Sequence, residues 1–180
     1  TRLILWEMAD MLSLDLVDKG VVTNQIVLTV GYDKESLADG HYTGEVVCDH
    51  YGRKIPKHAH GTQNLGRHTS STRKIIDATM ALFDRIIDKT LLARRLNLTA
   101  CNVIREEDIP EVESYEQISL FDMAEAANAD NNAEEKERAL QEAMLLIKHK
   151  YGKNAILKGT NYTEGATARE RNRSIGGHKA

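Results

Sequence analysis

The chain has 180 residues, of which 41% are hydrophobic and only 5% aromatic, so it is long enough for one aliphatic-core domain with appended segments. Its first residues do not show a signal-peptide pattern, and the sequence contains no apolar run of membrane-spanning length. Its two cysteines, Cys48 and Cys101, lack paired-ligand spacing. We therefore expect a cytoplasmic protein with no membrane partner and no disulfide framework.

The net charge of -3 hides four blocks of alternating sign. Residues 1–49 carry 3 basic and 9 acidic side chains, and residues 50–105 carry 11 and 3. Residues 106–142 carry 2 basic and 13 acidic side chains, and residues 143–180 carry 8 basic and 2 acidic side chains. Such asymmetry favours a polyanionic partner for the basic blocks, although a charge run is often only a solvated face.

The first predicted elements are a helix and a strand. Residues 3–17 place Leu5, Met8, Ala9, Leu12 and Leu16 on one apolar stripe, which predicts a helix that Gly20 ends. Residues 26–32 alternate apolar and small or polar side chains, which predicts a strand with one buried face. Because the chain begins with Thr1 and enters this helix at once, we expect it to be a fragment.

The next predicted elements complete a small α+β domain. Residues 33–56 are polar and contain glycine, which predicts an excursion with a hairpin turn near residues 51–52. Residues 57–65 predict an unusually polar strand with one face open to water or a ligand. A capped helix follows from about residue 72 to residue 87, and then a strand over residues 95–101. We expect a small antiparallel sheet with two helices on one face.

The chain changes character after Arg105, so the predicted domain spans residues 1–105. Residues 106–132 are acidic and lack a sustained period, which predicts a linker. Residues 133–180 predict a C-terminal helix with Leu140, Met144 and Tyr151 on its apolar stripe, followed by a basic tail. We expect this tail to be loosely ordered unless it docks.

A short apolar peptide stands out within the acidic linker. It is similar to the bacterial sliding-clamp-binding motif, and its residues are Gln117, Ile118, Ser119, Leu120 and Phe121. Leu120 and Phe121 would fill an apolar pocket, and Gln117 would satisfy polar groups at its rim. The alternative is that Leu120 and Phe121 fold back on the domain.

A second pattern favours contact with DNA phosphates. It combines a polar strand, hydroxyl side chains at a helix start and nearby basic residues, which suit backbone binding without sequence specificity. The predicted DNA-binding residues are Lys57, His58, His60, Thr62, Asn64, Arg67, Thr69, Ser70, Ser71, Thr72, Arg73, Lys74, Arg94, Arg95 and Asn97. Taken singly, each is more readily an ordinary cap or a solvated side chain, whereas the set as a whole favours phosphate contact.

The pattern of potential metal ligands argues against a metal centre in this chain. His58 and His60 lie near Cys48 and His50, but their spacing matches no familiar zinc site. The chain has no phosphate-binding glycine loop or nucleophile elbow, and its acidic pairs lie in the linker. We expect no catalytic residue, metal or cofactor here.

Four segments together resemble the C-terminal part of UmuC/DinB-like Y-family translesion DNA polymerases, especially the Gram-positive UmuC-type group. The segments are residues 3–9, 57–62, 152–157 and 171–180. The resemblance implies a little-finger domain that lies along double-stranded template-primer DNA, and a clamp-tethered polymerase active in the SOS response. It also implies a first strand and a palm domain with two Mg²⁺ ions upstream of Thr1.

Other functional classes remain open from the residues alone. The main alternative is a free-standing, non-enzymatic DNA-binding or sliding-clamp adaptor. A single-stranded RNA binder is disfavoured because the predicted strands lack stacking aromatic side chains. A metal-dependent hydrolase would require metal ligands that the spacing does not supply.

Overall fold

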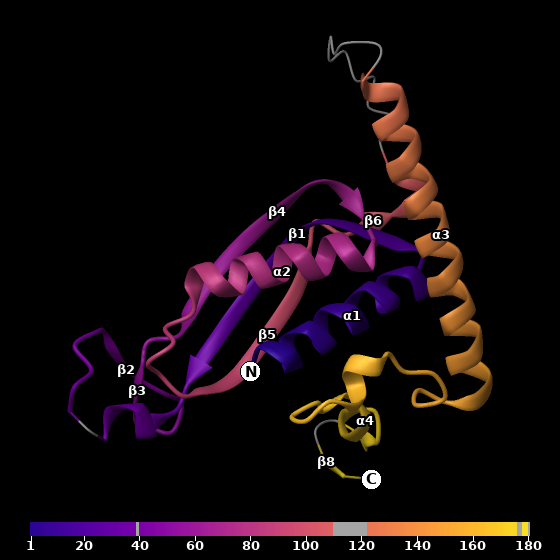
Figure 1. The fold of residues 1–180 in the computed structure, drawn as a ribbon. Helices are drawn as coiled ribbons and strands as arrows, with labels where there is room; N and C mark the ends of the chain where they lie inside the picture. Colours follow the sequence, from indigo (N-terminus) through magenta and orange to yellow (C-terminus); the bar gives the residue numbers. More distant parts are fainter. Residues whose placement is uncertain (39, 110–121, 176–177, 180) are drawn as a thin grey trace.

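The computed structural model describes residues 1–38, 40–109, 122–175 and 178–179. Its centre is an antiparallel sheet with helices α1 (Arg2–Asp18) and α2 (Thr72–Ile86) side by side on one face (Figure 1). This arrangement confirms the predicted α+β class and the placement of both helices on one face.

The sheet is built around strand β1 (Val21–Tyr32), which pairs with antiparallel neighbours on both sides. Strand β4 (Ala59–Thr69) lies on one side of it and strand β5 (Ala93–Cys101) on the other, in the order β4-β1-β5. The short strand β6 (Ile104–Arg105) continues the pairing at the start of β1. Among the described residues the sheet therefore has three long strands, and the outer edges of β4 and β5 have no strand partner.

The core forms where the buried face of β1 meets the two helices. Ile26 and Leu28 of β1 are fully buried, as are Leu5 of α1 and Leu82 of α2. Gly61 of β4 brings α2 close, because a Cβ atom there would lie 2.9 Å from Leu82 Cδ1. These aliphatic contacts match the low aromatic content of the sequence.

The excursion between β1 and β4 contains a hairpin, as predicted. It starts with the 3₁₀ helix η1 (Lys34–Leu37), and its strands are β2 (Val46–Cys48) and β3 (Lys54–Pro56). In Figure 1 the hairpin lies at the end of the sheet where β1 finishes, far from helix α3.

The C-terminal part packs against the helical side of the domain. After the 3₁₀ helix η2 (Glu106–Asp108), helix α3 (Asp122–Tyr151) runs past one end of α1 and α2 (Figure 1). The remaining elements are η3 (Gly159–Tyr162), α4 (Ala168–Arg171), β7 (Ser174–Ile175) and β8 (His178–Lys179). In the described chain, no helix is both long and apolar enough to cross a membrane.

Helix α3 differs from its prediction in two ways. It begins at Asp122 rather than at residue 133, so it includes residues that were predicted to be linker. Its docked side is also not the predicted apolar stripe: Met144 is buried, but Leu140 and Tyr151 are 58% and 67% exposed. The buried Gln141 faces the domain instead, because α3 packs on the polar start of α2.

Candidate nucleic-acid interface

The face of the sheet that points away from the helices is polar across all three long strands. In β1 the residues alternate, so Gln25, Val27 and Thr29 lie on the face opposite the buried Ile26 and Leu28. Antiparallel pairing aligns neighbouring strands residue by residue, and directly paired residues point to the same face.

The register of the three strands therefore places the polar side chains of this face in rows that run across the sheet. His60 and Asn97 flank Thr29, and Thr62 and Thr99 flank Val27. We call this surface the open face; its residues are Gln25, Val27, Thr29, Gly31, His60, Thr62, Asn64, Arg95, Asn97, Thr99 and Cys101. Five of the predicted DNA-binding residues thus lie together on one face.

Hydrogen bonds hold several open-face side chains in place. Gln25 Nε2 donates to Asn64 Oδ1 at 2.9 Å, and Thr29 Oγ1 lies 2.9 Å from His60 Nδ1. The exposed side chains offer several hydrogen-bond donors, as contact with phosphate and sugar oxygens requires.

Three predicted residues lie at the margin of the open face. Lys57 and His58 precede the first residue of β4, and the Lys57 ammonium pairs with Glu45 at 2.7 Å. Arg94 lies at the register shift of the β1–β5 pairing, between the residues opposite Tyr32 and Gly31, and its guanidinium pairs with Asp33 at 3.0 Å. The backbone hydrogen bond from Glu35 N, helped by the charge of Arg94 and its hydrogen bond, holds the pKa of Asp33 below its usual value and outweighs the opposing effect of burial.

The predicted residues at the start of α2 lie in a different place, beneath α3. Ser71 is the N-cap, as expected, and its Oγ accepts a hydrogen bond from Lys74 N at 3.3 Å. The same hydroxyl donates to Glu137 Oε2 at 2.6 Å, and Arg73 N donates to Glu137 Oε1 at 2.9 Å. A carboxylate of α3 thus occupies the position that would suit a phosphate.

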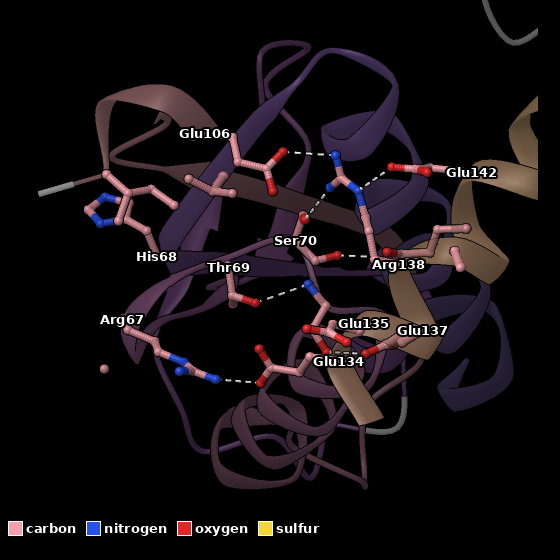
Figure 2. Close-up of a pocket in the computed structure, with 16 residues that line it drawn as sticks. Arg67, His68, Thr69, Ser70, Glu106, Glu134, Glu135, Glu137, Arg138 and Glu142 are labelled. Carbon is pink, nitrogen blue, oxygen red and sulfur yellow. Dashed lines mark hydrogen bonds and ion pairs between the residues drawn. The ribbon is translucent and has the colours of Figure 1, made fainter. Parts of the chain in front are cut away.

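A cavity of about 1170 Å³ lies beside this contact and is lined by residues of β4, of α3 and of the segment just before α2 (Figure 2). At its rim Arg67 and Lys74 both pair with Glu134. Figure 2 also shows Arg138 between Ser70, Glu106 and Glu142.

The innermost residues of this contact are also satisfied by α3. Gln141 Nε2 donates to Ser70 O and to Thr72 Oγ1, each at 2.9 Å, and Thr69 Oγ1 accepts from Ser71 N. Of the predicted DNA-binding residues, five thus lie on the open face and three at its margin. The other seven lie at the end of β4 and the start of α2, and six of them contact α3.

Sequence reasoning missed both the contribution of β1 to the open face and the α3 contacts. The alternation in β1 shows which of its side chains lie opposite the core. Which residues of β4 and β5 lie beside those side chains is known only from the strand register. Glu134 and Glu137 lie in the first turns of the predicted C-terminal helix, and nothing in the sequence pairs them with the start of α2.

Two further sequence predictions concern other sites. The peptide Gln117–Phe121 lies outside the described residues. His58, His60, Cys48 and His50 do not assemble: nowhere in the described ranges do three or more His, Cys, Asp or Glu side chains form a metal-ligating group.

Comparisons with known proteins agree with this fold. The family model described as "impB/mucB/samB family C-terminal domain" matches residues 1–120. The chain is also 31% identical over 160 residues to UvrX of Bacillus subtilis (strain 168), a protein provisionally named for UV-damage repair. That match covers 88% of this chain but only 30% of UvrX. No solved structure matches the chain.

Proposed function

Because the chain belongs to the family of impB/mucB/samB C-terminal domains, the C-terminal region of Y-family proteins, we propose that it is the DNA-binding part of a translesion DNA polymerase. In this proposal the open face lies along the backbone of template-primer duplex without reading its sequence. Nucleotidyl transfer with two Mg²⁺ ions belongs to a part of the parent protein outside this chain. The parent acts in the cytoplasm during lesion bypass.

The observation that carries this proposal is the composition of the open face. A surface of threonine, asparagine, glutamine, histidine and arginine side chains on a three-stranded sheet offers donors to phosphate and sugar oxygens. It presents neither a helix nor a projecting ribbon that would enter a groove, so it suits sequence-independent binding. The basic balance of residues 50–105 supplies the long-range attraction to the polyanion.

The test is duplex binding measured at several salt concentrations. We expect Arg95→Ala to weaken the affinity for a primer-template duplex roughly fivefold to tenfold and to lower the salt slope by about one. Lys136→Ala is the matched control, because it removes an exposed positive charge from α3 rather than from the open face. Absent or salt-independent duplex binding by the native chain would overturn the proposal, and so would an equal loss in both variants.

We also propose that the peptide Gln117–Phe121 tethers the protein to a bacterial sliding clamp. The support is the sequence alone: an apolar Leu-Phe pair follows a glutamine in an acidic segment. Tethering would raise the local concentration of the polymerase at the primer end without tight DNA binding.

The tether is tested with the double variant Leu120→Ala, Phe121→Ala. We expect the variant to lose binding to a purified bacterial sliding clamp while its affinity for duplex DNA stays unchanged. Equal clamp binding by the native and variant chains would show that the peptide is not the tether, and unchanged DNA binding shows that the variant is folded.

A further inference from the structure

The hairpin between β1 and β4 has a tip that internal hydrogen bonds hold in one conformation. We define the tip loop as residues 49–53. Asp49 Oδ1 accepts hydrogen bonds from Tyr51 N and Arg53 N, both at 2.9 Å. Gly52 has φ +73°, a backbone conformation that glycine adopts without strain. These hydrogen bonds fix the backbone of the tip loop, so its side chains project in defined directions.

Tyr51 is the side chain that this loop presents. It is 78% exposed, the largest exposed fraction among the large hydrophobic residues of the described chain. The Arg53 guanidinium lies 5.0 Å from the centroid of its ring, and the His50 ring meets it edge-on at 5.4 Å. Arg53 is fixed in turn, because its Nε donates to Asp49 Oδ2 at 2.7 Å.

The tip loop borders a cavity that leads to the open face. This cavity has a volume of about 420 Å³, and its charged lining side chains are four cations and one carboxylate: Lys34, Arg53, Arg94, Arg95 and Asp49. The carboxylate is already paired with Arg53. Arg95 belongs to both surfaces, since it pairs with Gly31 at the end of the open face.

We propose that the tip loop is a platform on which an unpaired nucleotide stacks, next to the duplex held by the open face. The inference rests on the proposed DNA-binding function and adds single-stranded DNA at a duplex junction as the ligand. An exposed aromatic ring held beside cationic side chains binds bases by stacking and the following phosphates by charge.

The ligand has to be unpaired for a physical reason. Inside a duplex each base is covered by its neighbours, so its flat surface is not available to a protein ring. A single-stranded overhang that leaves the duplex at the Arg95 end of the open face offers both a free base and a phosphate.

The chain supplies a matched control for this site. Tyr162 is also strongly exposed, at 62%, and the Arg169 guanidinium lies 5.1 Å from its ring centroid. It lies in η3 of the C-terminal part, away from the sheet (Figure 1). If any exposed tyrosine-arginine pair bound DNA non-specifically, substitution of either tyrosine would weaken binding. Binding at the junction requires Tyr51 alone.

The experiment compares three DNAs with the full chain: a blunt duplex, and the same duplex with a 5′ or a 3′ overhang that carries 2-aminopurine. We expect one overhang to tighten binding roughly tenfold over the blunt duplex, with a change in 2-aminopurine fluorescence. Tyr51→Ala should lose that gain and leave the affinity for the blunt duplex unchanged. Tyr51→Phe and Tyr162→Ala should both keep it.

The possible outcomes distinguish a failure of the stacking platform from a failure of the proposed duplex binding. If the blunt duplex is not bound, the proposed duplex-binding function fails. If the blunt duplex binds but neither overhang adds affinity, only the stacking platform is overturned. Equal losses in Tyr51→Ala and Tyr162→Ala, or a full loss in Tyr51→Phe, would overturn it as well.

Discussion

The buried carboxylate of Glu7 joins the C-terminal part of the chain to the domain. Its side chain is fully buried, and it accepts hydrogen bonds from Asn161 Nδ2 and Thr167 N at 3.1 and 3.0 Å. The Arg171 guanidinium pairs with it at 3.1 Å. Burial by itself would raise the pKa of Glu7, but the hydrogen bonds from residues 161–168 outweigh it and lower the pKa.

We expect Glu7→Gln to destabilise the protein by about 3 kcal/mol, because it leaves Arg171 facing a neutral group in a partly buried site. Urea unfolding of the native and variant chains measures this difference. Glu164→Gln removes the same charge from an exposed position and should cost little. Equal effects of the two substitutions would contradict the central role of Glu7.

The lowered pKa of Glu7 also predicts a pH dependence. Since the folded-state pKa lies below the ordinary value of 4.5, the stabilisation is complete above that value and is lost as the pH falls through the folded-state pKa. Hydrogen exchange of residues 159–172, corrected for the intrinsic rate at each pH, should therefore keep its protection down to pH 4.5 and lose it at a lower pH, as the carboxylate of Glu7 is protonated. In Glu7→Gln this step should disappear, and its persistence would assign the titration to another carboxylate.

At the scale of elements, the start of α2 depends on a residue of α3. The local cap is Ser71, but Glu137 extends it by accepting from both Ser71 Oγ and Arg73 N. A carboxylate at this end also interacts favourably with the helix dipole. The same contact means that a DNA phosphate reaches the α2 start only if α3 moves away.

Loss of this contact should loosen α3. We expect Glu137→Gln to cost about 1–2 kcal/mol and to increase hydrogen exchange in residues 133–151. The neighbouring Glu135→Gln removes the same charge from an exposed position of α3 and serves as the control. If both variants exchange like the native protein, Glu137 does not hold the helix.

At the scale of the whole molecule, the two ends of the chain share one packed region. Leu14 of α1 lines the same small cavity as Met144, Leu157 and Ala168 from the C-terminal part. Lys158 adds an ion pair with Asp10 of α1 at 2.5 Å. The tail was expected to be loosely ordered unless it docked, and it packs against α1 as far as Asn172.

This shared packing predicts cooperative unfolding. We expect the full chain to unfold in one thermal transition, and a version ending at residue 109 to melt roughly 10 °C lower because α1 loses its cover. Calorimetry of both proteins measures the difference. Two separate transitions in the full chain, or an unchanged melting temperature after truncation, would show that the parts are independent.

Local patterns in the sequence were enough to predict the helices, the long strands, a hydroxyl cap at the start of α2 and the hairpin, because these depend on residue spacing and short-range hydrogen bonds. They also identified five residues that share the open face, since alternation along a strand assigns each side chain to a face.

Only the tertiary structure decided which neighbours those residues have. The pairing of Asn97 with Thr29, the capping of α2 by Glu137 and the burial of Glu7 against Arg171 join residues far apart in the chain. A periodic sequence pattern predicts whether an element is a helix or a strand and which of its faces is buried. It does not predict which other element packs against that face. Helix α1 shows the difference: its apolar stripe was visible in the sequence, whereas Glu7 and Asp10 are buried only because the C-terminal part folds back over them.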